Sequence, residues 1–235
     1  VSLIRKMAKI AVTRHDYAQS GIVCTVEHEF SHEQTAYERF LASGPFAILP
    51  LQGNRSSIVW AERTDLADKI MALSDNDFQV ELRQRFGDFL GALKPCGPRW
   101  CYPLSLQFTN QCIDHRLVLA GDASHAMHPL AGQGLNMGLR DVAALFEVLD
   151  DARKLGLDFG THTVLDRYQR WRRFDNTLML GATHGINSLF SNDVEPLRLA
   201  RTFGLAAVDN VPRLKRYFMK QAMGLNGELP KLMQG

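Results

Sequence analysis

The chain has 235 residues, of which 46% are hydrophobic, and its 27 basic and 25 acidic residues give a formal net charge of +2. This length and composition predict one large or two smaller globular domains, and the near balance of charges gives no general attraction to nucleic acid. No apolar run approaches the roughly 18 residues that a membrane-spanning helix needs, so we expect a protein that is not integral to a membrane.

The four cysteines suggest a cytoplasmic protein, and the start of the chain is unusual. The four cysteines contain no Cys-x-x-Cys pair, which excludes the usual spacing of a zinc site or a thioredoxin-like redox pair, and we expect reduced thiols at Cys24, Cys96, Cys101 and Cys112. The chain begins Val-Ser-Leu-Ile-Arg, without an initiator Met or a signal-peptide core. We interpret this start as a truncation point.

The region from Gly21 to Glu62 has the pattern of a β-sheet. Short apolar segments predict strands at residues 21–28, 36–41, 46–51 and 55–62. Turn sequences separate them, Ser-Gly-Pro from Ser43 and Gln-Gly-Asn from Gln52. Adjacent strands are therefore expected to pair antiparallel in a meander with one covered face.

Two helices and a further extended segment follow. The predicted helices cover residues 64–73 and 74–90, with Thr64 and Ser74 as N-caps, because a short hydroxyl side chain accepts hydrogen bonds from first-turn amides. Residues 99–108 are predicted to be extended, with Trp100 and Tyr102 on one side.

The second half of the chain begins with an apolar run and then becomes helical. Residues 116–122 end at Gly121 and Asp122 and resemble a central parallel strand. Apolar residues then recur at helical spacing at Leu135, Leu139, Val142, Leu145, Phe146 and Leu149. Residues 163–190 predict a long helix interrupted near Gly181 and Gly185, and the final helices are expected at 194–207 and 212–223.

The loop between the apolar run and the first of these helices contains the candidate ligand-binding residues. Asp122 lies where a strand ends, which suits a carboxylate that accepts from the hydroxyls of a sugar-like chain. Pro129 fixes a turn, while Gly132 and Gly134 allow the backbone to approach a flat or phosphorylated ligand. A helix that opens near Gly134 directs free amides and a partial positive charge toward such a ligand. This arrangement suits a flavin, although a glycine loop before an amphipathic helix is the plainer alternative.

The complete run from Arg116 to Asp141 resembles the second flavin motif of the para-hydroxybenzoate-hydroxylase class of monooxygenases, and among these the ring hydroxylases of ubiquinone biosynthesis. The segments Gly44-Pro-Phe-Ala-Ile-Leu-Pro-Leu, Ser57-Ile-Val-Trp and Tyr102-Pro-Leu are similar to the substrate-side sheet of that branch. The resemblance implies that FAD is bound by Gly121, Asp122, Pro129, Gly132, Gln133, Gly134, Leu135 and Asn136.

The resemblance also implies a fold and its division. The expected class is α/β (α+β), with a mostly antiparallel substrate-side sheet, the remnant of a Rossmann-like FAD-binding domain and a C-terminal helical region. The corresponding segments are 16–112 for the sheet, 1–15 and 113–160 for the FAD-binding part, and 161–235 for the helices. The Gly-x-Gly-x-x-Gly and Asp-Gly motifs of this class are absent, and only Ser2 to Arg5 resembles the end of the latter. We therefore expect an incomplete, inactive fragment.

The activity implied for the intact protein is hydroxylation of the ring of a polyprenylated phenol with NAD(P)H and O₂. The substrate is expected between the flavin loop and the sheet, at Phe46, Leu49 and Trp60, and no catalytic residue is assigned. A prenylated substrate suggests contact with other ubiquinone-biosynthesis proteins and a peripheral position at the inner membrane. Two alternatives remain, a hydroxylase of a soluble aromatic compound and a non-catalytic assembly module.

A histidine pair and an arginine cluster are interpreted as structural or solvent-exposed groups. His125 and His128 lack a third ligand at suitable spacing, so we expect them to shape the loop and predict no metal site. Four arginines on the long helix are expected to form a solvated face, with membrane or partner contact as the alternative: Arg167, Arg170, Arg172 and Arg173.

Overall fold

The computed structural model describes residues 2–129, 132–190, 204, 207–222 and 228–234. The chain divides into two compact units, which are described separately below. Unit one comprises Val1–His15, Ser105–Gly185 and Ala200–Gly235; unit two comprises Asp16–Leu104 and Ile186–Leu199. The predicted division into four segments stays a prediction.

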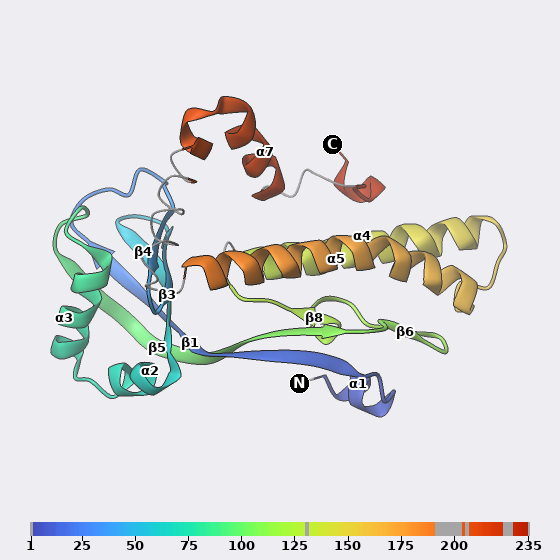
Figure 1. The fold of residues 1–235 in the computed structure, drawn as a ribbon, viewed down its shortest axis with the longest axis horizontal. Helices are drawn as coiled ribbons and strands as arrows, with labels where there is room; N and C mark the ends of the chain where they lie inside the picture. The colour runs from blue at the N-terminus through green and yellow to red at the C-terminus, as the bar shows by residue number, and fades with distance from the viewer. Residues whose placement is uncertain (1, 130–131, 191–203, 205–206, 223–227, 235) are drawn as a thin grey trace. The chain divides into compact units, whose positions relative to one another are not determined.

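Unit two is built on an antiparallel sheet (Figure 1) in which the second, third and fourth strands follow the predicted meander. The predicted pairing of the first strand with the second is wrong, because the first strand lies beside the fourth. The strands are β1 (Val12–His28), β2 (Tyr37–Leu41), β3 (Gly44–Pro50) and β4 (Arg55–Arg63). β4 pairs with both β1 and β3, and in this register Trp60 lies beside Ile22 on one side and Phe46 on the other. The four predicted strands are confirmed, although β1 starts nine residues before the predicted Gly21.

One face of this sheet is covered by two helices, α2 (Thr64–Met71) and α3 (Asp75–Phe86). Phe78, Leu82 and Phe86 of α3 are fully buried and join the sheet's core residues. Ser74 caps α3 by accepting a hydrogen bond from the Asp77 amide, as predicted. Thr64 is not an N-cap. Arg63 occupies that position, and the Thr64 hydroxyl lies 3.2 Å from that of Ser20.

Unit one begins with the short helix α1 (Leu3–Met7) and continues where β5 (Leu93–Thr109) leaves unit two. The C-terminal part of β5 pairs antiparallel with β8 (His125–Ala126). The predicted central parallel strand at 116–122 is wrong. Only β7 (Leu117–Val118) is extended there, and it pairs antiparallel with β6 (Ile113–Asp114). A parallel strand needs parallel neighbours, and none lies beside β7 among the described residues.

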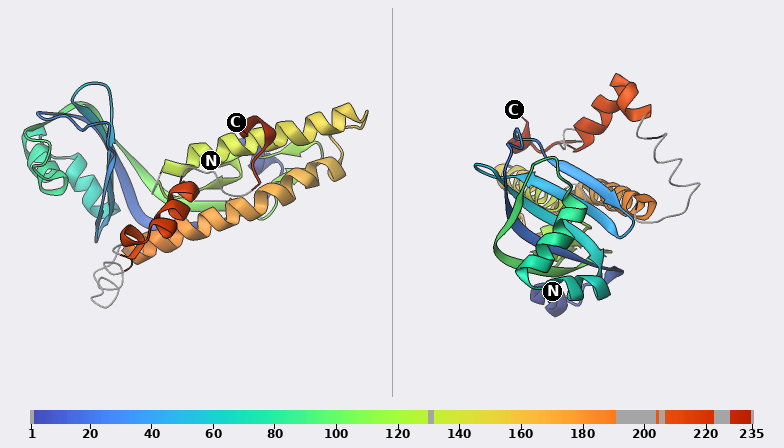
Figure 2. Two further views of the ribbon diagram at one scale, coloured as in Figure 1. Left: turned by 90° about the horizontal axis from the view of Figure 1, so that it is seen from above. Right: turned by 90° about the vertical axis from the view of Figure 1, so that its left-hand side faces the viewer.

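Two long helices complete the core of unit one and run side by side (Figures 1 and 2). They are α4 (Gln133–Lys154) and α5 (His162–Phe190), which enters unit two at its C-terminal end. Their shared core is apolar and contains Ile113, Ala144, Val148, Ala152, Val164, Leu165 and Tyr168. The predicted interruption of α5 at Gly181 and Gly185 is wrong, because interior glycine weakens a helix by about 1 kcal/mol without removing a backbone hydrogen bond.

Several apolar residues whose spacing predicted α4 do not belong to its buried face. Leu135, Leu139, Val142 and Phe146 are each more than half exposed, whereas Leu145 and Leu149 pack partly against the core. The buried face instead combines small residues with Arg140 and Asp141. Periodicity therefore identified the helix correctly but not the side that it buries.

The C-terminal region contributes α7 (Pro212–Ala222), a confirmed prediction, and the 3₁₀ turn η3 (Lys231–Met233). The Lys231 amide donates a hydrogen bond to Glu147 Oε2 of α4 over 2.7 Å. The predicted helix at 194–207 lies mostly outside the described residues. In the part of the chain that the structure describes, no helix has the length and apolar character needed to cross a bilayer.

Candidate flavin site

The centre of the candidate site is the carboxylate of Asp141, which α4 carries into the interior of unit one. Its Oδ2 accepts hydrogen bonds from the Gly121 amide over 2.9 Å and from His125 Nε2 over 2.6 Å. Its Oδ1 accepts from Arg172 Nε of α5 over 2.8 Å. One fully buried carboxylate therefore joins the start of the Gly121–Asn136 loop, which we call the flavin loop, to both long helices.

Asp141 is held in its ionised form. Burial by itself raises the pKa of the carboxyl group, but the hydrogen bonds from His125, Arg172 and the Gly121 amide outweigh this effect and leave the pKa below its ordinary value. The Arg172 guanidinium supplies a compensating charge in the same interior. A buried charge of this kind is tolerated because it is paired and hydrogen-bonded.

The flavin loop passes close to α4 at two glycines. Gly121 has a φ of 54°, and a Cβ added there would lie 3.7 Å from the Gly138 Cα. A Cβ on Gly138 would lie 3.5 Å from the Gly121 Cα. A side chain much larger than a methyl group at Gly138 would therefore push the loop away from the helix.

The end of the flavin loop leaves room beside a helix N-terminus. The N-cap of α4 is Gly132, which has a φ of 61° and no side chain to cap the first-turn amides, and the first turn contains no acidic residue. A Cβ added to Gly132 or to Gly134 would meet no atom of a described residue within 4 Å. Open space beside a positively polarised helix end fits a flat ligand that carries negative charge.

The other predicted cofactor residues have different environments. Asp122 is exposed at the protein surface, and its backbone oxygen accepts a hydrogen bond from Gln107 Nε2. Gln133 is buried, and its Oε1 accepts from Asn136 Nδ2 over 3.4 Å, whereas Leu135 is 74% exposed. Pro129 is half-buried beside residues 130–131, which are not described. Their contact with a flavin stays a prediction.

The Ser2–Arg5 segment lies against the flavin loop. Ser2 Oγ accepts a hydrogen bond from the Arg5 amide and caps α1. The buried Arg5 guanidinium donates to the Ala123 carbonyl over 2.9 Å and to Gln107 Oε1 over 3.3 Å. Sequence reasoning missed this contact, as it missed the one between Asp141 and Arg172, because 118 residues separate Arg5 from Ala123.

His125 and His128 are both buried in the loop. His125 binds Asp141, and burial lowers the pKa of His128 to about 4, so His128 is neutral at physiological pH. No group of three or more His, Cys, Asp or Glu side chains in the described part of the chain has the geometry of a metal site.

The arginine cluster does not form one solvated face. The side chain of Arg172 is 1% exposed, and its nitrogens donate to Asp141, Asp175 and Asn176. Arg167, Arg170 and Arg173 are exposed as predicted. Placing Arg172 among the solvated residues was wrong, since composition cannot distinguish a surface arginine from one paired with a buried carboxylate.

The predicted substrate residues lie on opposite faces of the unit-two sheet. Phe46 and Trp60 are fully buried in the core against α3, where no ligand can contact them without opening that core. Leu49 is 40% exposed on the other face. Side chains alternate along a strand, so Phe46 and Leu49, three residues apart, point in opposite directions.

Comparison with known proteins identifies the family. A model described as "FAD binding domain" matches residues 2–176. The chain belongs to this FAD-binding-domain family. The predicted cofactor, FAD, is thereby confirmed. The glycine-lined N-terminus of α4 lies within the residues that the family model matches.

Relatives of this FAD-binding-domain chain include a ubiquinone hydroxylase of Rhodospirillum rubrum, 53% identical over all of this chain and 55% of that protein. A 3-demethoxyubiquinol 3-hydroxylase of Escherichia coli is 37% identical over 95% of this chain and 57% of that protein. The chain thus spans about half the length of the curated relatives it matches.

The fold is shared with p-nitrophenol 4-monooxygenase of Pseudomonas putida, with a TM-score of 0.76 and 20% identity over 97% of this chain and 57% of that one. The predicted fold class, α/β (α+β) with a mostly antiparallel sheet, is confirmed.

Proposed function

We propose that the intact protein is an FAD-dependent monooxygenase that hydroxylates the phenolic ring of a polyprenylated quinone precursor. The observation that carries the proposal is the open, glycine-lined N-terminus of α4 in a chain of the FAD-binding-domain family. The printed names of two relatives, a ubiquinone hydroxylase and a demethoxyubiquinol hydroxylase, support the substrate class.

In the proposed reaction, one atom of O₂ enters the ring and the other leaves as water, with two electrons supplied by NAD(P)H. Bound FAD supplies the chemistry that passes these electrons to oxygen. Gly132 and Gly134 admit the ring system, the α4 amides favour negative charge on it, and Asp122 accepts from hydroxyls of its side chain. Gly121, Pro129, Gln133, Leu135 and Asn136 complete the proposed cofactor set.

The buried Asp141–Arg172 pair is proposed to position the loop without touching the cofactor. Asp141 holds Gly121 and His125, the residues that flank the segment Asp122–Ser124. A rigid scaffold of this kind keeps the donors of a binding loop at fixed positions. We also propose that residues 1–15 and 113–160 serve the cofactor and that residues 16–112 serve the substrate.

We propose that the substrate's apolar part contacts the open face of the unit-two sheet. On that face Val23, Ala47 and Val59 share one cross-strand row, and Leu49 pairs with Ser57 in the next. These residues are partly exposed, in contrast to Phe46 and Trp60. An isoprenoid chain suits such a surface, and a bilayer-borne substrate agrees with peripheral contact with the membrane and with other proteins of its pathway.

The first test is a fluorescence titration of FAD into the wild-type protein, the Asp122→Ala variant and the Asp75→Ala variant. Asp75 is a matched control because its side chain is 94% exposed in unit two. We expect saturable binding that Asp122→Ala weakens and Asp75→Ala leaves unchanged. Equal affinity in all three proteins would contradict the placement of the site.

The second test measures NAD(P)H-dependent product formation by the intact protein with a polyprenylated phenol and with the same phenol lacking its chain. We expect a higher kcat/KM for the prenylated compound, since its chain adds apolar contact area. Preference for the unprenylated phenol would indicate a hydroxylase of soluble aromatics. FAD binding without oxidation of either compound would favour a non-catalytic role.

A further inference from the structure

Unit one contains two adjoining cavities beside α5, and no glycine of the flavin loop lines either of them. One has a volume of about 230 Å³ and the other of about 350 Å³, and Phe108, Thr177 and Leu180 line both. The larger approaches the size at which small-molecule sites occur. Because the two share three lining residues, we treat them as the two ends of one site.

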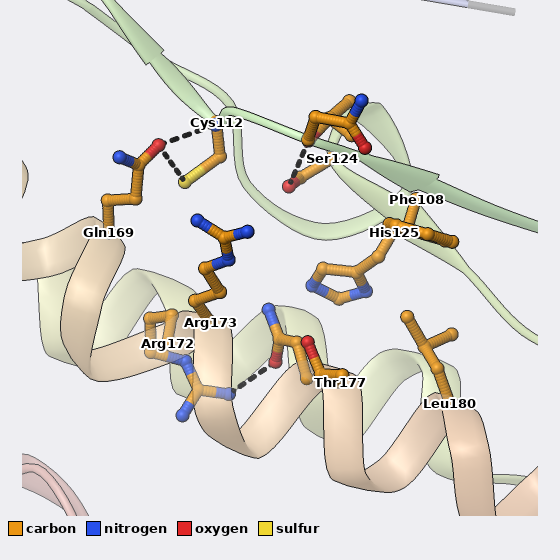
Figure 3. A pocket seen from close by; sticks show the side chains of 12 residues that line it. Phe108, Cys112, Ser124, His125, Gln169, Arg172, Arg173, Thr177 and Leu180 are labelled. Atoms are coloured by element: carbon orange, nitrogen blue, oxygen red, sulfur yellow. Dashed lines mark hydrogen bonds between the residues drawn. The ribbon is translucent and has the colours of Figure 1, made fainter. Parts of the chain in front are cut away.

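Polar side chains form part of the lining of the smaller cavity, and one of them, the solvent-exposed Arg173, is a cation. Arg173 extends from α5 toward Cys112 and Ser124 (Figure 3). Its guanidinium makes no hydrogen bond or ion pair with any residue that the structure describes, whereas its neighbour Arg172 is fully engaged. The negative charge of Asp141 is already compensated by Arg172. The polar end thus presents an arginine fork that is available to an anion.

The larger cavity is apolar. Leu106 and Phe108 of β5 line it together with Leu180 of α5. Gly181 adds space, because a Cβ placed there would meet no atom within 4 Å. The rings of His15 and His184, 5.2 Å apart in an edge-to-face arrangement, form part of the wall. This end offers contacts to a hydrocarbon chain and few to a charged group.

We propose that these cavities bind an amphipathic carboxylate, with its head group on Arg173 and its hydrocarbon chain against Phe108, Leu180 and Gly181. A carboxylate matches the planar guanidinium fork in a bidentate hydrogen bond. An apolar chain removes the cavity lining from water. Ser124 and His125 of the flavin loop line the smaller cavity, but none of the loop's glycines lines either cavity.

The head-group test is calorimetric titration with sodium decanoate, below its micelle concentration, beside decanol and acetate. Loss of a charged hydrogen bond is expected to weaken binding about tenfold or more. Arg173→Gln should therefore weaken decanoate binding by that factor and decanol binding little, and Arg173→Lys should recover part of the loss. Arg170→Gln is the matched control, because Arg170 belongs to the same helix and its side chain is 82% exposed.

The test of hydrocarbon-chain binding places a larger side chain in the larger, apolar cavity. Gly181→Leu should abolish decanoate binding without harming the fold, because leucine favours a helix more than glycine does. Ala182→Leu adds the same side chain at the next position, which is exposed and does not line the cavity, and it should bind as wild type does. The proposal is overturned if decanoate does not bind, if Arg170→Gln weakens binding as much as Arg173→Gln, or if Gly181→Leu binds normally. FAD titration of the same variants separates this result from a failure of the flavin proposal.

Discussion

Arg172 Nε donates a hydrogen bond to Asp141 Oδ1 over 2.8 Å, and both side chains are almost completely buried, with exposures of 1% and 0%. The two residues stand on different helices, 31 positions apart, so their pairing connects α4 to α5 in the interior. Asp141 also binds Gly121 and His125 through its other oxygen. The same pair therefore stabilises the helix packing and fixes the start of the flavin loop.

Asp141→Asn is expected to lower the free energy of unfolding by about 3–5 kcal/mol, because it leaves the Arg172 charge buried without its partner. Urea denaturation provides the measurement. Asp151→Asn is the control, since Asp151 pairs with Arg167 at the surface over 3.3 Å and should cost less than about 1 kcal/mol. Similar losses of unfolding free energy in the two variants would show that the buried pair contributes no more stability than the surface pair.

His128 predicts a loss of stability in mild acid. Its pKa in the folded chain is about 4, below the ordinary 6.5. The unfolded chain consequently binds more protons between these values, and the stability contributed by the neutral ring is complete above about pH 6.5 and is lost as the pH falls toward 4. We expect a loss of about 2 kcal/mol between pH 7.5 and pH 5 from this group, measured by urea denaturation.

The matched variants for this pH effect are His128→Gln and His162→Gln. His162 is exposed at the start of α5, so its removal should leave the pH dependence intact. His128→Gln should flatten it, whatever its effect on stability at pH 7.5. An unchanged slope in His128→Gln would assign the acid sensitivity to other groups.

Two valines of α4 test which side of that helix carries the packing energy. Val148 is 1% exposed and Val142 is 59% exposed. Val148→Ala should destabilise the protein by about 2 kcal/mol through lost apolar burial and a small cavity. Val142→Ala should change stability by less than about 0.5 kcal/mol. Thermal or urea denaturation measures the stability of both variants, which carry the same substitution on the same helix. A larger loss of stability in Val142→Ala than in Val148→Ala would mean that the exposed side of α4 is packed in solution.

Gly134 is expected to show opposite effects on stability and on cofactor binding. Gly134→Ala replaces a helical glycine and should raise the stability of the cofactor-free protein by about 0.5 kcal/mol. Its Cβ enters the open space proposed for the flavin, so FAD should bind about tenfold more weakly, a loss of roughly 1.4 kcal/mol.

Gly185→Ala is the control for Gly134→Ala, because Gly185 is also helical with open space at its Cβ position and lies outside the flavin loop. It should gain similar stability and retain full affinity in the same FAD titration. A normal affinity for Gly134→Ala would place the ring system elsewhere.

Features close together in the sequence were enough to predict the four strands of unit two, one helix cap and the family. Turn residues and apolar segments identified the four strands of unit two, and Ser74 was recognised as the cap of α3 from its hydroxyl and position. The ordered motif from Gly121 to Asn136 led to the FAD-binding family, since it combines glycines, a proline and a carboxylate at fixed spacing. Such features depend on residues close together in the chain.

Which side chains are buried, and what they contact, became clear from the three-dimensional fold. Leu139 and Val148 are equally apolar in the sequence, but only Val148 meets the core. In the sequence Arg172 does not differ from the neighbouring arginines, but in the structure it is buried and paired with Asp141. Residues 116–122 contain an apolar run, yet strand pairing depends on neighbours from elsewhere in the chain, and β7 is only two residues long. Burial and pairing arise from contacts between distant segments, which composition and periodicity do not encode.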